Sequence, residues 1–171
     1  GFVNGVVKGN LTGCKINLPF PSVGATENLM MAATLAKGKT IISNAAKEPE
    51  VEDLAKCLND MGAKITGAGS NSIKIQGVKN LKKTNHEIIP DRIVAGTFLI
   101  AGIMLKSKFT IDCINADHLT MPIKILKKMG ANIEIKKNKI KILPSSNLKG
   151  IKLKTAPYPG FPTDLQAQMM S

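Results

Sequence analysis

The chain has 171 residues, of which 43% are hydrophobic, and a formal net charge of +12. This apolar content is enough for a folded core and excludes an intrinsically disordered chain. The longest apolar run, residues 93–105, contains Gly96 and Thr97 and is too short to cross a bilayer, so we expect no membrane span and no membrane partner.

The positive charge could indicate a nucleic-acid partner, but the distribution of residue types argues against one. Surfaces that bind nucleic acids usually combine arginine and lysine with aromatic residues that stack on bases. Here Arg92 is the only arginine and aromatic residues make up 4% of the chain. We therefore expect the lysines to solvate exposed faces, with no nucleic-acid partner, although the same charge would also attract small anionic substrates.

The cysteines and histidines do not indicate a disulfide or a metal centre. Cys14, Cys57 and Cys113 are odd in number and have no C-x-x-C spacing, which predicts reduced, mostly buried thiols of a cytoplasmic protein. His86 and His118 have no second ligand at a recognisable spacing, so we expect no metal site and no cofactor.

An internal repeat of about 68 residues organises the chain. The motif Met-Gly-Ala-x-Ile occurs at 61–65 and again at 129–133, and the segments around it keep their order. A third copy begins at Pro162 and stops at Ser171. A period of this length is too long for a common solenoid and predicts a βαβ-type unit that is repeated within a larger fold.

The first copy follows a short tail, residues 3–18, which reads as the end of a preceding unit. Residues 25–36 are apolar nearly all round and are predicted to form a helix that is buried on all sides. Residues 50–61 are predicted to form an amphipathic helix that ends at a left-handed Gly62. Gly67 and Gly69 lie between two strand-like segments, so they predict a hairpin loop and not a dinucleotide-binding motif.

The second copy repeats this pattern. Residues 93–105 form the apolar helix, Gly130 takes the place of Gly62, and residues 132–142 alternate with period two around Lys137 and Asn138, which predicts a hairpin. Each unit should therefore contain a helix, a strand, a second helix and a hairpin, with one further strand leading into the next helix. Buried helices inside and half-exposed sheets outside define an α/β fold that is the inverse of a doubly wound one.

Three helix starts carry polar residues that could do chemistry: Ser22-Val23-Gly24, Asp91-Arg92 and Thr163-Asp164. The simpler interpretation is an N-cap, because Ser, Thr and Asp oxygens accept hydrogen bonds from unpaired amides there. The functional alternative is that free amides at the positive end of the helix hold an anion. Glu48, Glu50, Glu52 and Asp53 lie at the start of the next helix. The simplest interpretation is that their negative charges interact favourably with the dipole of that helix.

Four segments resemble the UDP-N-acetylglucosamine enolpyruvyl transferases, which open peptidoglycan synthesis. They are Phe-Pro-Ser-Val-Gly-Ala-Thr-Glu-Asn at 20–28, Asn-Ala-Ala-Lys-Glu-Pro-Glu at 44–50, Pro-Asp-Arg at 90–92 and Phe-Pro-Thr-Asp-Leu-Gln-Ala-Gln at 161–168. The resemblance covers essentially the whole chain, in order. The first and last motifs are specific to this family within its superfamily.

The resemblance implies an inside-out α/β barrel of the enolpyruvyl transferase type. Such enzymes have two domains, each built from three units around a pseudo-threefold axis, with the substrates in the cleft between the domains. In the family the chain crosses between domains near the position of Pro90. Residues 1–89 would then end one domain, with its last unit at 22–83, and 90–171 would begin the other, with a unit at 90–150 and a truncated next unit. We expect the sequence to be a central piece of a longer cytoplasmic enzyme.

The resemblance also implies a reaction and its residues. Enzymes of the family transfer the enolpyruvyl group of phosphoenolpyruvate to the 3′-hydroxyl of UDP-N-acetylglucosamine and release phosphate. Asp164 matches the carboxylate that binds the sugar nucleotide and accepts the hydroxyl proton. Ser22, Val23 and Gly24 match part of the loop that binds the UDP-sugar. Phe20 stands where some members have a lysine, so no charge contact is expected from that position.

Other residues of the family have no counterpart in this chain. The cysteine that donates a proton lies in a Gly-Cys-x-x-Gly loop, and Cys14, Cys57 and Cys113 all lack that context. The Lys-Asn pair and the arginines that hold phosphoenolpyruvate are also missing, and Arg92 is not one of them, so this piece alone is expected to be inactive. Two alternatives stay open. One is the sister transferase acting on shikimate 3-phosphate, whose loop favours Ser-Ser-Gln, and the other is a non-catalytic module of the same fold.

Overall fold

The computed structural model describes residues 5–171 and divides into two compact units, Gly1–Ile88 and Ile89–Ser171. Of the tail predicted at 3–18, positions 3 and 4 lie outside the described residues. No helix among residues 5–171 is long and apolar enough to cross a membrane.

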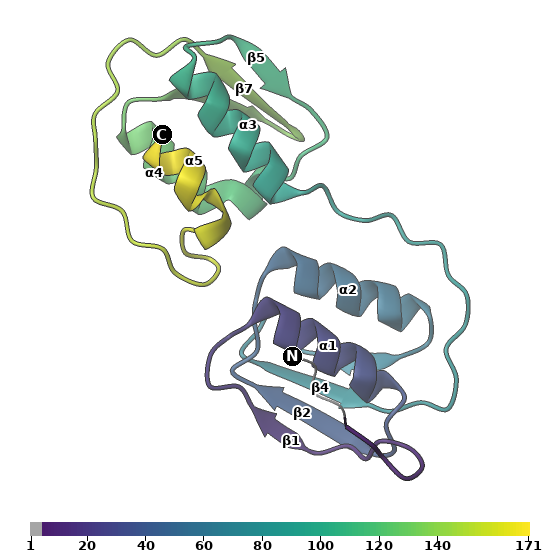
Figure 1. Cartoon of the computed structure of the whole chain (residues 1–171). Coiled ribbons are helices and arrows are strands. Elements are labelled where there is room, and N and C mark those ends of the chain that lie inside the picture. The colour runs from purple at the N-terminus through teal and green to yellow at the C-terminus, as the bar shows by residue number, and fades with distance from the viewer. Residues whose placement is uncertain (1–4) are drawn as a thin grey trace. The chain divides into compact units, whose positions relative to one another are not determined.

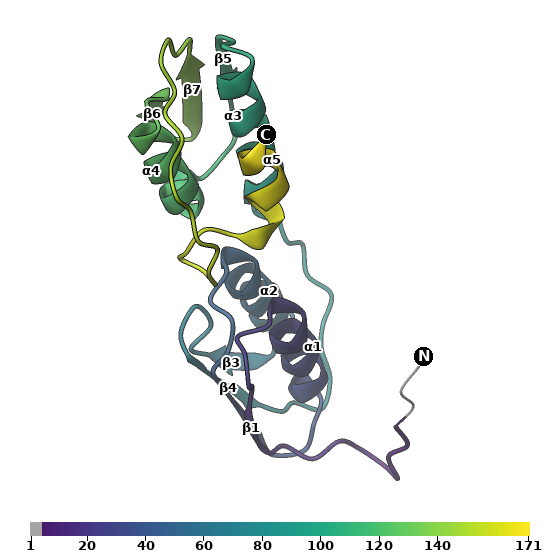
Figure 2. The same cartoon turned by 60° about the vertical axis from the view of Figure 1, so that its left-hand side comes forward.

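The first unit is a four-stranded sheet with two helices packed against it (Figure 1). The strands are β1 (Lys15–Asn17), β2 (Lys39–Ser43), β3 (Lys64–Thr66) and β4 (Ser72–Gln76), and the helices are α1 (Val23–Thr34) and α2 (Pro49–Asp60). The sheet order is β1-β2-β4-β3; β1 pairs with β2 in parallel, and the other pairs are antiparallel. Helices α1 and α2 lie side by side (Figure 2).

The second unit repeats this topology with three strands. It contains α3 (Arg92–Met104), β5 (Phe109–Ile111), η1 (Ala116–Leu119), α4 (Thr120–Lys128), β6 (Asn132–Lys136), β7 (Lys139–Leu143), η2 (Thr163–Leu165) and α5 (Gln166–Met170). Its sheet order, β5-β7-β6, is equivalent to β2-β4-β3. The predicted order of helix, strand, helix and hairpin is therefore confirmed in both units.

The further strand predicted before each helix forms only once among the described residues. Strand β1 precedes α1 because β2 lies beside it and supplies parallel hydrogen bonds. Residues 83–89, before α3, and residues 151–154, before η2, contain no strand. This part of the prediction is wrong for those two segments, since no strand pairs with them within residues 5–171.

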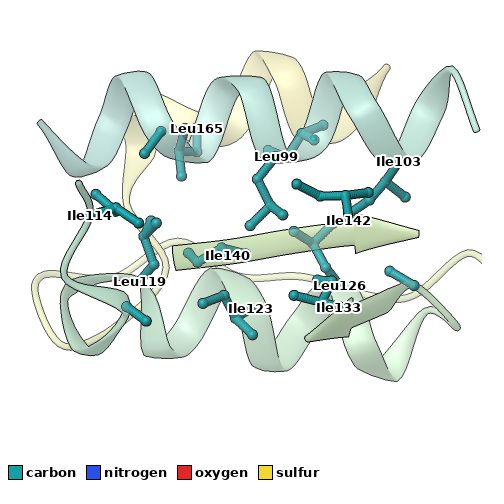
Figure 3. Close-up of a cluster of buried hydrophobic side chains, with 14 of the residues drawn as sticks. Leu99, Ile103, Ile114, Leu119, Ile123, Leu126, Ile133, Ile140, Ile142 and Leu165 are labelled. Atoms are coloured by element: carbon teal, nitrogen blue, oxygen red, sulfur yellow. The ribbon is translucent and has the colours of Figure 1, made fainter. Parts of the chain in front are cut away.

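The core of the second unit lies between α3, the sheet and α4 (Figure 3). Leu99 on α3, with no exposed surface, and Leu126 on α4, 2% exposed, both belong to this core. Ile140 and Ile142 on that strand are fully buried, whereas the lysines that alternate with them are not. The period-two pattern thus predicted the hairpin and its buried face.

The amphipathic helix predicted at 50–61 is α2. Val51, Ala55 and Leu58 form its buried stripe, while Lys56 and Asn59 are exposed on the other side. The glycines after α2 and α4 adopt the left-handed conformation expected of helix C-termini, with φ of +99° at Gly62 and +103° at Gly130.

The prediction that the two apolar helices are buried on all sides is wrong for this chain. Met31 and Leu35, at the C-terminal end of α1, are 43% and 51% exposed, and Val94 and Phe98 on α3 are 51% and 60% exposed. A helix that is apolar all round needs cover on every face. In each unit the sheet and the neighbouring helices cover only part of it, so an apolar face of α1 and of α3 stays open.

The thiols also differ from expectation. All three cysteines are free, but Cys14 and Cys113 are exposed and only Cys57 is partly buried, so the prediction of mostly buried thiols is wrong. Cys14 directly precedes β1 and Cys113 follows β5, and both strands lie at the edge of a sheet, where little covers the residues beside them.

Candidate functional site

Ser22 is the N-cap of α1, as the simpler interpretation predicted. Its backbone is extended (φ −81°, ψ 125°), and its Oγ accepts a hydrogen bond from the amide of Ala25 at 3.3 Å. Among residues 5–171 this hydroxyl accepts one amide, and no hydrogen bond holds the first two amides of the helix, those of Val23 and Gly24, so both stay available to a ligand. The cap and an anion-binding role are therefore compatible.

Gly24 lies in open space. It is exposed, and an ideal Cβ built on it meets no atom within 4 Å among the described residues. Neither packing nor a positive φ requires glycine there. Glycine in a helix costs roughly 0.5–1 kcal/mol relative to alanine, so its presence in the first turn suits the close approach of a ligand to the backbone.

A buried hydrogen-bond chain holds this helix start in place. The hydroxyl of Thr26, which has no exposed surface, donates to the carbonyl of Ser22 at 2.8 Å and accepts the amide of Ala46 at 3.0 Å. The Asn44 side chain, in the same loop as Ala46, donates to the carbonyl of Leu18 at 2.8 Å. The loop between β2 and α2 thus fixes the backbone on both sides of Phe20-Pro21-Ser22.

A carboxylate group near this helix start was not predicted from the sequence. Burial raises the pKa of the Glu27 carboxyl above its usual range, and the negative charges of Glu50 and Glu48 raise that pKa further. Glu48 itself is buried, with 8% exposure. It occupies the N-cap position of α2, but its side chain accepts no hydrogen bond from the amides of that helix. Glu50 and Glu52 lie in the first turn of α2, where negative charge interacts favourably with the helix dipole. That interaction does not explain why Glu27 on α1 lies close enough to Glu50 and Glu48 to be affected by their charges.

Asp164 lies in the second unit, in the short helix η2. It is exposed, and its carboxylate makes no hydrogen bond or ion pair within residues 5–171. The residue that precedes η2 is Pro162, and no side chain caps this helix. The N-cap interpretation of Thr163-Asp164 is therefore wrong, whereas Asp91 does cap α3, accepting the amides of Ile93 and Val94 at 2.8 and 3.0 Å.

Buried residues on either side of Asp164 hold it in place. Phe161 is 2% exposed and Leu165 is fully buried in the core of the second unit, where Figure 3 shows Leu165 beside α3. Further along the chain, Gln168 Nε2 donates to Thr97 Oγ1 on α3 at 3.0 Å. The carboxylate of Asp164 therefore projects from a backbone that is fixed at both ends.

No group of three or more potential metal ligands occurs among residues 5–171. A hollow of about 840 Å³ opens between α3, α4, α5 and the segment 148–155 of the second unit. Its lining mixes apolar side chains with polar ones such as Lys149, Thr155 and Gln166, and contains none of the four predicted site residues.

The arrangement of elements places the chain in the class of enolpyruvyl transferase folds. The crystal structure of the enolpyruvyl transferase NikO from Streptomyces tendae matches it with a TM-score of 0.79 and 23% identity, over 94% of this chain and 41% of that chain. The chain belongs to the EPSP synthase family, because the family model described as EPSP synthase (3-phosphoshikimate 1-carboxyvinyltransferase) matches residues 3–171.

Curated relatives match the sequence far more closely than these solved structures do. The chain is 52% identical over 171 residues to UDP-N-acetylglucosamine 1-carboxyvinyltransferase 1 of Caldanaerobacter subterraneus subsp. tengcongensis, covering all of this chain and 41% of that protein. It is 53% identical over 165 residues to UDP-N-acetylglucosamine 1-carboxyvinyltransferase of Halothermothrix orenii, covering 96% of this chain and 40% of that protein. The chain thus spans about two fifths of the length of these relatives.

Proposed function

We propose that the protein containing this chain transfers the enolpyruvyl group of phosphoenolpyruvate to the 3′-hydroxyl of UDP-N-acetylglucosamine and releases phosphate. The observation that carries this proposal is the identity of 52% over the full chain to a relative named for this sugar nucleotide. The structures that match the fold are only 23–24% identical, which supports the fold but does not identify the acceptor.

The proposed architecture is an inside-out α/β barrel in which the open faces of α1 and α3 are covered by further units of the same kind. Exposed large apolar side chains on both helices, Met31 and Phe98 among them, support this proposal, since such side chains gather where a protein surface makes a contact. We further propose that the crossing near Pro90 joins two different domains. The cytoplasmic location expected from the sequence stays a prediction.

In the proposed reaction, the 3′-hydroxyl oxygen attacks C2 of phosphoenolpyruvate while C3 gains a proton, which gives a tetrahedral intermediate. Loss of phosphate and of a C3 proton then restores the double bond. Asp164 would accept the hydroxyl proton as the C–O bond forms. Its carboxylate is exposed, has no partner within residues 5–171 and stands on a fixed backbone, which suits that role.

Ser22, Val23 and Gly24 would bind the UDP-sugar together with Asp164. The two unused amides at the start of α1 point out of the positive end of a 12-residue helix, where a phosphate or a sugar oxygen is well placed to accept them. The proposed reaction needs no cofactor. Phosphate is the leaving group, and the enolpyruvyl group is transferred without net oxidation or reduction.

The acceptor can be tested directly with the full-length protein. Phosphate release is measured with phosphoenolpyruvate and either UDP-N-acetylglucosamine or shikimate 3-phosphate, and the product is weighed by mass spectrometry. We expect phosphate only with the sugar nucleotide, whose mass should rise by one enolpyruvyl group. Release with shikimate 3-phosphate alone would support the sister activity that the family description names. Release with neither acceptor would support a non-catalytic module.

A further inference from the structure

The segment that leads to Asp164 is a narrow loop closed at its base. The amide of Ala156 donates to the carbonyl of Phe161 at 2.9 Å, and the amide of Gly160 donates to the carbonyl of Pro157 at 2.7 Å. Phe161, at the base, is anchored in the core. The tip of the loop, 157–160, carries Tyr158, the single tyrosine of the chain.

The ring of Tyr158 packs against the guanidinium of Arg92, the single arginine. The Arg92 Cζ lies 5.5 Å from the ring centroid, within the range of a cation–π interaction. Arg92 is buried, with 6% exposure. A planar guanidinium can stack on an aromatic face, and the ammonium of lysine does so less well. The other 23 basic residues of the chain are all lysines.

The position of Arg92 is unfavourable for the helix that carries it. It is the first residue of α3, where the helix dipole disfavours positive charge. The Asp91 cap fixes the backbone of this turn through two amides, and the Arg92 side chain is buried against the ring of Tyr158. A residue that opposes a local rule on a rigid backbone is a candidate for a functional role.

The same two turns of α3 also hold the chain after Asp164. After Asp164, Leu165 packs against Gly96 and the Gln168 side chain donates to Thr97. Before Asp164, Tyr158 packs against Arg92. Helix α3 therefore contacts the chain on both sides of this aspartate. Helix α5 lies along α3 in both views (Figures 1 and 2). We propose that Arg92 and Tyr158 are positioning residues that fix the loop before Asp164 and thereby orient its carboxylate.

This inference rests on the proposed role of Asp164, and a double-mutant cycle separates the two. Kinetics of the full-length enzyme are measured for Tyr158→Phe, Tyr158→Leu, Arg92→Lys and Asp164→Asn, and for Tyr158→Leu combined with Asp164→Asn. Misplacement of a reacting group by about 1 Å can cost on the order of 10²-fold in rate, so we expect Tyr158→Leu to lower kcat roughly tenfold or more. Tyr158→Phe, which keeps the ring, should retain most of the turnover, and Arg92→Lys should lie between them.

The cycle gives the decisive outcome, because residues that act through one another are non-additive. If Tyr158 acts through Asp164, Tyr158→Leu should cause no further loss of kcat in the Asp164→Asn enzyme. A further loss by the same factor would overturn the positioning role and leave the proposed function intact. Near-normal turnover of Asp164→Asn alone would overturn both. Thermal melts accompany each variant; if Tyr158→Leu unfolds the enzyme, the cycle is run with Arg92→Lys.

Discussion

Leu165 occupies the space that a side chain on Gly96 would need. An ideal Cβ on Gly96 would lie 2.6 Å from Leu165 Cδ1, closer than real Cβ contacts come, and 3.1 Å from its Cδ2, which is also tight. Leu165 has no exposed surface into which it could withdraw, and it directly follows Asp164. The glycine in α3 therefore sets how closely η2 approaches this helix.

Gly96→Ala should displace η2 from α3. Overpacking of a filled core typically costs about 1–3 kcal/mol, and this exceeds the roughly 0.5–1 kcal/mol that alanine gains over glycine in a helix. We expect a lower melting temperature and, in the full-length enzyme, a lower kcat. Gly96→Ala combined with Leu165→Val should recover part of both, since valine is shorter. If Gly96→Ala raised the melting temperature, the close approach of Leu165 would be wrong.

Gly24→Ala should have the opposite effect on stability. A Cβ at position 24 meets no atom of the described chain, so alanine should stabilise α1 by a few tenths to about 1 kcal/mol. If a ligand approaches this backbone, the methyl group should raise the KM for UDP-N-acetylglucosamine and leave the KM for phosphoenolpyruvate nearly unchanged. Gly150→Ala, which also adds a methyl group in open space, is the control and should change neither KM. An unchanged KM for the sugar in Gly24→Ala would contradict the proposed binding role.

Sequence periodicity predicted the elements of each unit but not the contacts between distant residues. Alternation around Ile140 and Ile142 fixed the hairpin, and Gly62 predicted a helix end, because both depend on neighbouring residues alone. The approach of Leu165 to Gly96 depends on how two separate elements pack, and no local spacing encodes it. Likewise, the motif around Asp164 indicated a helix start and a cap, whereas the structure places Pro162 at the cap position.

The segments that cover the apolar helices could not be predicted from the sequence either. The apolar residues of segments 25–36 and 93–105 predict that each helix makes apolar contacts on every face. It does not state which segments supply them, and within the described chain Leu35 and Phe98 have no such cover. The error therefore concerns the partners of the helices and not their apolar character.

Glu27→Gln should make stability less dependent on pH. Because the pKa of Glu27 is raised in the folded protein above its ordinary value of 4.5, folding favours the protonated form. Its contribution is complete below about pH 4.5 and is lost as the pH rises through the raised folded-state pKa. Glutamine cannot ionise, so the variant should melt at the same or a higher temperature than the wild type at pH 7, and this advantage should vanish below about pH 4.

The control for this measurement is Glu52→Gln on the exposed face of α2. Glu52 lies in the first turn, where its charge complements the helix dipole, so its removal should leave the melting temperature at pH 7 unchanged or slightly lower. A lower melting temperature for Glu27→Gln than for Glu52→Gln at pH 7 would show that Glu27 is held by a favourable charge contact.

Asp164→Asn tests the proposed base in the full-length enzyme. Asparagine keeps the shape of the side chain but cannot accept a proton, so we expect turnover to fall by roughly 10²-fold or more, the usual scale for a lost general base. The carboxylate is exposed and makes no hydrogen bond or ion pair within residues 5–171, so the melting temperature should hardly change for Asn or for Ala.

An N-cap would behave differently, because alanine in place of an aspartate cap costs about 1 kcal/mol while asparagine substitutes well. Asp91→Ala, at a position where the cap is present, is the matched control and should lower the melting temperature. Phosphate release beside a thermal melt measures both effects, and near-normal turnover in a folded Asp164→Asn enzyme would exclude Asp164 as the base.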